Sequence, residues 1–169
     1  MSGVKIQLCK LSPNDGILQY NMLQQIAADD NGFTNPANGL SFEEFKAWLI
    51  QQDFWSRGEE LPQGYVRQTW FWLMVDEKVA GCGKIRQCLT EQSRIKGGTI
   101  GYAIAPNYRG RGYGNLILFL LIQKANELGV IDKVLTVEKY NWASAKVIEK
   151  NGGVLYDENE LRWYYKIDN

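Results

Sequence analysis

Apolar and polar residues along the first third of the chain alternate with periods typical of strands and helices. Residues 4–8 alternate and predict a first strand. Apolar residues near helical spacing predict a helix from about residue 15 to 29, and an Asn-, Gly- and Pro-rich loop follows over 31–40. Ser41 and Glu44 form an S-x-x-E capping box, so a second helix with one aromatic face is expected to begin there.

The rest of the chain is predicted to form an antiparallel meander and then a strand–helix–strand crossover. The meander strands are expected over residues 66–75, 79–88 and 99–105, with turns at 76–78 and 89–98. After a Gly-rich loop, the predicted elements are a helix over 115–128 ended by Gly129, a strand over 134–138, a helix over 143–150, and strands over about 154–157 and 161–167. The pattern predicts one α+β domain over residues 1–169.

The charge balance and the lack of histidine exclude several function classes. Lys+Arg and Asp+Glu number 19 each, which argues against a protein whose main task is to hold nucleic acid or an anionic membrane. The chain contains no histidine, which removes Ser-His-Asp and Cys-His catalysis and argues against a zinc site, so no metal is expected.

The cysteines and the apolar segments indicate a soluble cytoplasmic protein. Cys9, Cys82 and Cys88 are an odd number at irregular spacing, which is typical of free thiols in a reducing compartment. The first residues lack the apolar core and cleavage site of a signal peptide. The longest apolar run, residues 116–122, is too short to span a bilayer.

The loop over residues 106–115 contains the candidate chemistry. It joins a strand to a helix and carries the run Arg109-Gly110-Arg111-Gly112-Tyr113-Gly114. The first turn of a helix leaves backbone N–H groups unpaired, and alternate glycines let a ligand approach them closely. Two arginines add permanent positive charge, so the loop fits an anion such as a pyrophosphate. The alternative is a plain structural turn before a helix; nucleic-acid binding through the two arginines lacks an accompanying basic stripe.

The surrounding motifs resemble those of the GNAT superfamily of N-acetyltransferases. Its pyrophosphate motif is Gln/Arg-x-x-Gly-x-Gly/Ala, which Arg109, Gly112 and Gly114 match in order after Ile104-Ala105-Pro106. Its second motif, an Asn opening a later helix with a small residue soon after, is matched by Asn141 and Ser144. The chain is more closely similar to an uncharacterised branch of predicted acetyltransferases, from residue 40 or so to the end.

The resemblance implies a fold and a cofactor site. The fold would be α+β, with a mixed, mostly antiparallel central sheet of about six or seven strands, helices on both faces, and a splayed parallel pair over residues 99–105 and 134–138. Acetyl-CoA would lie in the splay, its pantetheine arm bonding to the backbone of Tyr102, Ala103 and Ile104 as an added strand would. The pyrophosphate would take the N–H groups from Arg109 to Asn115, that is Arg109, Gly110, Arg111, Gly112, Tyr113, Gly114 and Asn115. Asn141 would bond the pantetheine arm, cap its helix, or do both.

The resemblance implies direct attack of an amine on the thioester, with a backbone N–H near Ile104 stabilising the oxyanion. Many family members place a tyrosine in the helix after the Asn as general acid, where this chain has Val147 or Ile148. Glu138, at the end of a splayed strand, is a candidate base that acts directly or through water, or else a solvent-facing carboxylate. Tyr140 is a weaker candidate, as are Tyr156 and Cys88.

The function that follows is transfer of an acetyl group from acetyl-CoA to a primary amine of a small molecule or peptide. The alternative is a catalytically weak GNAT-fold module that binds CoA or a partner. Aromatic and acidic residues over 33–60 suit either a cationic amine acceptor or a core with solvated charges. The aromatic segment over residues 162–165 can pair across a homodimer.

Overall fold

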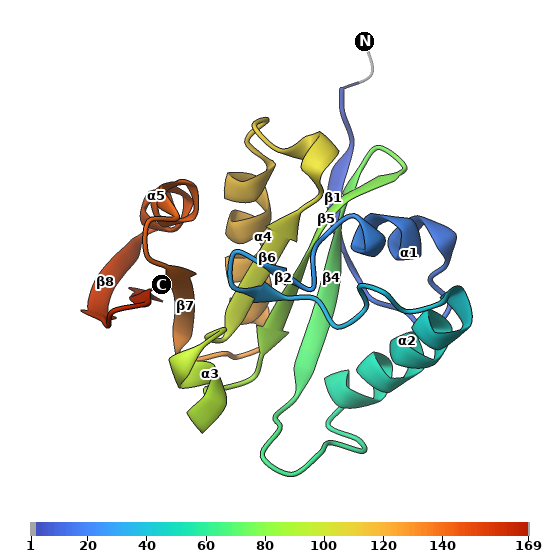
Figure 1. Ribbon diagram of the computed structural model, residues 1–169, viewed down its shortest axis with the longest axis horizontal. Helices are drawn as coiled ribbons and strands as arrows, with labels where there is room; N and C mark the ends of the chain where they lie inside the picture. The colour runs from blue at the N-terminus through green and yellow to red at the C-terminus, as the bar shows by residue number, and fades with distance from the viewer. Residues whose placement is uncertain (1–2, 169) are drawn as a thin grey trace.

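The computed structural model describes residues 3–168. Five α-helices, nine strands and a short 3-10 helix alternate along this part of the chain (Figure 1). In chain order they are β1 (Ile6–Lys10), α1 (Ile17–Gln24), β2 (Asp29–Asp30), β3 (Phe33–Thr34), α2 (Phe42–Ser56), β4 (Gln68–Val75), β5 (Lys78–Arg86), α3 (Glu91–Ile95), β6 (Ile100–Ile104), a 3-10 turn (Pro106–Tyr108), α4 (Tyr113–Glu127), β7 (Lys133–Glu138), α5 (Trp142–Lys150), β8 (Gly153–Glu158) and β9 (Arg162–Ile167).

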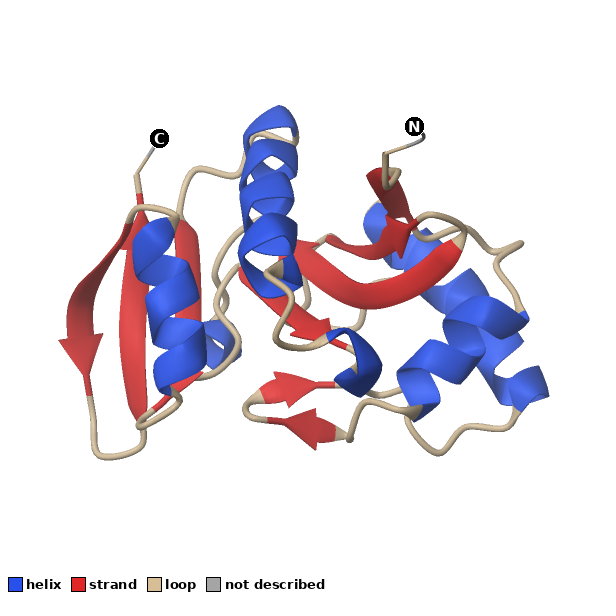
Figure 2. Cartoon of the chain, turned by 90° about the horizontal axis from the view of Figure 1, so that it is seen from above, coloured by secondary structure: helices blue, strands red, loops and turns tan. Residues whose placement is uncertain are grey.

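The first layer is an antiparallel sheet of four strands in the order β1-β4-β5-β6. Side chains of β4 alternate between its two faces: Phe71 and Leu73 join the cluster packed under α4, whereas Trp70 and Trp72 join the cluster under α1 and α2. Both faces are therefore buried, which explains why β4 is an almost continuous apolar run. Figure 2 shows α4 and the β2–β3 hairpin on opposite sides of this sheet.

The second layer is an antiparallel sheet of three strands in the order β7-β9-β8, with α5 packed on it (Figure 2). Its edge strand β7 runs alongside β6, the edge of the first sheet. The two strands are joined near their starts, where the Thr99 N–H donates to the Val134 carbonyl at 2.9 Å and Val134 N–H donates to Thr99 Oγ1 at 2.8 Å. Beyond that point they form no common ladder, so the expected splayed parallel pair divides the strands into two sheets.

Most predicted elements are confirmed with shifts of a few residues, but the first helix is shorter than expected. The prediction extends it to about residue 29, whereas α1 ends at Gln24. The buried Asn35 side chain donates at 2.8 Å to the carbonyl of Leu23, in the last turn of α1, and at 2.8 Å to that of Ile26, just beyond the helix, so it satisfies acceptors where the chain leaves α1. The predicted capping box at Ser41 and Glu44 and the terminal Gly129, at φ +74°, are both confirmed.

Two short elements are absent from the prediction. The β2–β3 hairpin replaces the predicted end of the first helix and the start of the loop expected over residues 31–40, and it turns at Asn31 and Gly32 with φ of +51° and +95°. The turn expected over residues 89–98 contains α3, which Thr90 caps by accepting from the Ser93 N–H at 3.0 Å.

The expected strand pairing of residues 162–165 across a homodimer is wrong. The segment lies in β9, which pairs with β7 on one side and β8 on the other. Both of its edges are therefore occupied within the chain, and β8 is the free edge of that sheet. No helix in residues 3–168 is long and apolar enough to cross a membrane.

Candidate active site

A cleft of about 550 Å³ opens between β6 and β7, with the β2–β3 hairpin and α5 on its rims. Eleven of the residues predicted to bind the cofactor line it: Tyr102, Ala103, Ile104, Arg109, Gly110, Gly112, Tyr113, Gly114, Asn115, Asn141 and Ser144. Arg111 and the predicted catalytic residues Glu138 and Tyr140 do not line it. The structure therefore brings together almost the whole predicted cofactor set, and it leaves the predicted catalytic pair outside.

The loop before α4 presents a row of free backbone donors to this cleft. Gly110 and Gly112 have φ of +75° and +83°, a left-handed conformation that side chains rarely adopt. A Cβ added at either position would meet no atom within 4 Å, so both face open space. Within residues 3–168, the N–H groups from Gly110 to Asn115 have no acceptor, and the first backbone bond of the helix runs from Leu116 N–H to the Gly112 carbonyl at 3.2 Å. This geometry suits an anionic group at a helix N-terminus.

The two arginine side chains of the loop have different positions from those expected. Arg109 donates from Nε to the Ile104 carbonyl at 2.9 Å and from an Nη to Asp30 Oδ2 at 3.1 Å. Its charge is thus used to hold the loop to β6 and to the hairpin. Arg111 is exposed and places its guanidinium 5.6 Å from the Tyr108 ring centroid. The loop therefore presents free N–H groups to the cleft, whereas its two guanidinium groups are engaged with the protein or exposed.

The edge of β6 offers alternate backbone groups to the cleft. Arg86 N–H donates to the Thr99 carbonyl at 2.7 Å, and Ala105 N–H donates to the Ala80 carbonyl at 2.9 Å. Because bonded pairs alternate along an antiparallel ladder, Ala103 also bonds towards β5, whereas Tyr102 and Ile104 turn their N–H and C=O groups to the cleft. Of the three backbone positions predicted for a pantetheine arm, Tyr102 therefore offers its N–H and C=O groups to the cleft, and Ala103 offers neither. Ile104 offers its N–H alone, because its carbonyl already accepts from Arg109 Nε.

The Tyr102 hydroxyl is a buried polar atom without a hydrogen-bond partner in residues 3–168. Burial raises its pKa to about 12, and the neighbouring Ser144 side chain acts in the opposite direction. An unsatisfied buried hydroxyl beside a cleft is costly unless a ligand supplies its partner. Asn141 caps α5, its Oδ1 accepting from the Ser144 N–H at 3.3 Å, and it also lines the cleft. Asn115 Oδ1 accepts from Asn151 Nδ2 at 2.9 Å, which joins the start of α4 to the end of α5.

The predicted catalytic residues lie at the outer end of β7. Glu138 packs against the hairpin turn, since a Cβ added at Gly32 would lie 3.4 Å from Glu138 Cγ and 3.7 Å from its Oε1. Tyr140 is 75% exposed and forms a surface cluster with Trp142 and Trp163, with ring centroids 6.5 and 6.3 Å away. The weaker candidates Tyr156 and Cys88 are exposed as well. Glu138 is thus the nearest of these groups to the cleft rim.

Five cationic residues that the sequence analysis does not select also line the cleft: Lys84, Arg86, Lys96, Lys146 and Lys150. Lys84 is 5% exposed, and its Nζ donates to the Thr34 carbonyl at 3.0 Å. Burial is the main reason why its pKa falls to about 7; Arg86 and Lys96 lower it further, and Cys82 opposes them. A lysine within an otherwise apolar strand is the only signal in the sequence that could have identified it.

The family follows from comparison with known proteins. Residues 24–153 match the model of the Acetyltransferase (GNAT) family. This chain is a member of that family. The GNAT fold, the seven strands divided by a splay, and the cleft between β6 and β7 agree with that membership. A search among curated proteins found no match.

Solved structures of GNAT proteins share the fold at low sequence identity. The Campylobacter jejuni N-acetyltransferase PseH, in complex with acetyl coenzyme A, is 19% identical with a TM-score of 0.63, covering 96% of this chain and 98% of its own. The ribosomal L7/L12 alpha-N-protein acetyltransferase RimL, in complex with coenzyme A, is 16% identical with a TM-score of 0.71, covering 95% and 92%. The PaiA N-acetyltransferase of Thermoplasma acidophilum, in complex with coenzyme A, is 14% identical with a TM-score of 0.63, covering 98% and 99%.

Proposed function

We propose that this GNAT protein transfers the acetyl group of acetyl-CoA to a primary amine in a ternary complex. The observation that carries the proposal is the row of unpaired N–H groups from Gly110 to Asn115 at the end of the cleft. These donors need an acceptor when they are removed from water, and a pyrophosphate provides several in a row. The acetyl-CoA and CoA complexes of PseH, RimL and PaiA support the same ligand.

The residues lining the rest of the cleft would hold the remaining parts of the cosubstrate. The N–H and C=O groups of Tyr102 and the N–H of Ile104 are the free strand edge that an extended amide chain can bond. The orphaned Tyr102 hydroxyl and the Asn141 amide lie on the same cleft and add polar partners. The thioester, when bound, supplies the electrophilic carbon, and the Ile104 N–H is the donor best placed to stabilise charge on its oxygen.

The acceptor amine must lose a proton before it attacks. We propose that Glu138 receives it through water, because its carboxylate lies beside the hairpin turn at the cleft rim without entering the cleft. Tyr140 has no part in this proposal, because it is exposed in an aromatic surface cluster.

The proposal is tested by ligand-induced stabilisation and by CoA release. Acetyl-CoA should raise the melting temperature, because a ligand that binds only the folded state stabilises it. Free CoA should then accumulate with some members of a panel of small-molecule and peptide amines. Stabilisation by acetyl-CoA with background CoA release for every amine would favour the alternative, a CoA-binding module of weak activity. Absence of stabilisation at millimolar acetyl-CoA would remove both functions.

A further inference from the structure

The cleft is strongly cationic although the chain as a whole carries no net charge. One carboxylate, Asp30, lines it, against six cationic side chains: Lys84, Arg86, Lys96, Arg109, Lys146 and Lys150. Two of these cations are neutralised, because Arg109 pairs with Asp30 at 3.1 Å and Lys96 pairs with Asp29 at 2.7 Å. Lys146 and Lys150 lie on α5, the helix capped by the proposed cosubstrate ligand Asn141. These contacts assign no role to the two remaining cations, Lys84 and Arg86.

Lys84 and Arg86 are two residues apart on β5, so both side chains lie on the face of the sheet that the β2–β3 hairpin covers. Lys84 Nζ lies 4.8 Å from the Phe33 ring centroid and 5.1 Å from that of Trp70, and its single hydrogen bond goes to the Thr34 carbonyl. Arg86 donates from Nη1 to the Gly98 carbonyl at 3.1 Å. Neither forms an ion pair with a carboxylate anywhere in residues 3–168. Most of their donors are therefore free.

Their position separates them from the proposed pyrophosphate site. Lys84 stands opposite Gly101 and Arg86 opposite Thr99, at the start of β6. The glycine loop follows the other end of β6, after Ala105. At about 3.3 Å per residue, the two ends of this segment are about 13–20 Å apart. One phosphate cannot serve both sites, so the Lys84–Arg86 pair needs a second anion.

We propose that the acceptor amine carries an anionic group, a carboxylate or a phosphate, which Lys84 and Arg86 bind at the hairpin end of the cleft. This inference rests on the proposed acetyl transfer and names the substrate class of the same site. Uncompensated buried cations cost free energy, and an anion from the substrate removes that cost. A guanidinium beside an ammonium suits either a carboxylate or a phosphate. The aromatic rings of Phe33 and Trp70 hold the Lys84 stem and limit where it can point.

The charged groups around Lys84 agree with an anion site. Arg86 on its own strand and Lys96 after α3 lower the Lys84 pKa, and Cys82 opposes them. The hairpin carboxylates Asp29 and Asp30 are already paired with Lys96 and Arg109, and Glu138 lies at the hairpin turn. A bound anion raises the Lys84 pKa and keeps the ammonium charged. The notion that acidic residues of the helical region select a cationic amine is not supported, because none of the residues from 35 to 60 lines the cleft.

The test uses matched acceptor pairs that differ only in the anion: tyrosine against tyramine, and O-phosphoethanolamine against ethanolamine. The measured quantity is the ratio of kcat/KM within each pair, which does not depend on the fraction of protein that is folded. We expect the anionic member to be preferred at least tenfold in the carboxylate pair or the phosphate pair, which identifies the anion. Lys84→Met and Arg86→Gln should each reduce that ratio about tenfold. Lys124→Met, on the outer part of α4, is the matched control and should leave it unchanged.

A kcat/KM ratio of one or less in both acceptor pairs would overturn the proposal. So would an equal loss of kcat/KM for the anionic and the neutral acceptor in the Lys84→Met enzyme, because that result would make Lys84 a general base. Failure of the proposed acetyl transfer gives a different result: acetyl-CoA does not raise the melting temperature, or no amine in the panel causes CoA release. A second measurement guards against misfolded variants. With the enzyme saturated in CoA at constant ionic strength, inorganic phosphate or benzoate should raise the melting temperature of the wild type and of Lys124→Met, and not that of Lys84→Met.

Discussion

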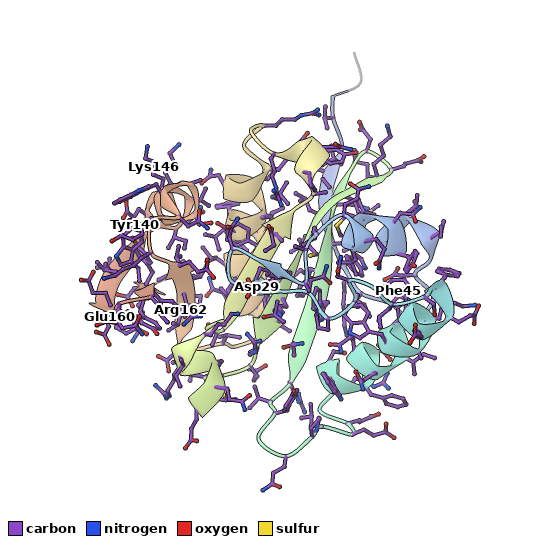
Figure 3. The ribbon with its side chains drawn as sticks, in the orientation of Figure 1. Asp29, Phe45, Tyr140, Lys146, Glu160 and Arg162 are labelled. Carbon is purple, nitrogen blue, oxygen red and sulfur yellow. The ribbon has the colours of Figure 1, made fainter. Side chains whose placement is uncertain are left out.

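Arg109 and Asp30 join the loop before α4 to the β2–β3 hairpin, with an Nη–Oδ2 distance of 3.1 Å. Since Arg109 also donates to the Ile104 carbonyl, one side chain connects the loop before α4, the edge of β6 and the hairpin. The hairpin has a second tie, between Asp29 and Lys96 at 2.7 Å. Figure 3 labels Asp29 in front of β6 at the centre of the molecule. The hairpin is thus fixed across the cleft by ion pairs at both ends of β6.

This arrangement predicts that Arg109 contributes to the structure of the loop more than to the charge of the anion site. Arg109→Gln should lower the free energy of unfolding by about 1 kcal/mol, since it loses a half-exposed ion pair and a charge-assisted bond. It should raise the Kd for CoA only a few-fold. Urea unfolding and calorimetric titration measure the two effects. If the Kd for CoA instead rises a hundredfold with stability unchanged, the guanidinium must contact the phosphates directly.

Gly112→Val tests the anion site against a control with the same backbone strain. Gly112 and Gly129 have φ of +83° and +74°, and a Cβ at either would meet nothing within 4 Å. Each substitution should therefore cost about 1–2 kcal/mol of stability through the left-handed conformation. Only Gly112→Val places a side chain in the cleft, so it alone should abolish stabilisation by CoA. Equal CoA binding by the two variants would place the pyrophosphate elsewhere.

Tyr102→Phe probes the orphaned hydroxyl. In the free protein this change removes a buried polar atom that has no partner, so stability should stay equal or increase. If bound CoA supplies the missing partner, the variant should bind CoA about 5–10-fold more weakly, which corresponds to about 1–1.4 kcal/mol. Thermal unfolding with and without CoA measures both quantities. Reduced stability without any loss of affinity would show that the hydroxyl serves the fold alone.

The sequence predicts the backbone geometry of the Gly-rich loop well because its signals are local. Gly110 and Gly112 have the left-handed φ that alternate glycines favour, and Asn141 caps the helix that it precedes. The hairpin is absent from the prediction although its Asn31-Gly32 turn is a strong signal, because its strands have two residues each and no alternation to detect. The end of α1 depends on Asn35, and the burial of Lys84 depends on the hairpin 50 residues earlier in the chain. Such tertiary contacts have no periodic pattern.

Glu138→Gln tests the proposed route for the proton. If the carboxylate accepts it through water, the variant should lose about 10²–10⁴-fold in kcat/KM at neutral pH, the usual contribution of general base catalysis. Its acetyl-CoA affinity should be unchanged, since Glu138 does not line the cleft. The kcat/KM profile from pH 6 to 9 is the measurement. Wild-type activity at every pH would exclude Glu138 and leave proton loss to ordered water.

The burial of Lys84 predicts how the free energy of unfolding depends on pH, and this prediction can be tested without a substrate. Its pKa of about 7 in the folded protein lies below its ordinary value of 10.5. Between these values the unfolded chain holds a proton that the folded chain does not, so the free energy of unfolding rises with pH from about 7 upward. Below pH 7 both states are protonated, and the cost of burying the charge is fully present.

Lys84→Met lacks this group, so its stability relative to the wild type should be greatest below pH 7 and should shrink by about 1–2 kcal/mol between pH 7.5 and 9. Urea unfolding at the two pH values measures the difference, and the Cys82 thiol, whose pKa burial raises to about 12, is present in both proteins. A difference that stays constant with pH would mean that Lys84 remains charged in the folded protein, held so by its carbonyl and aromatic contacts.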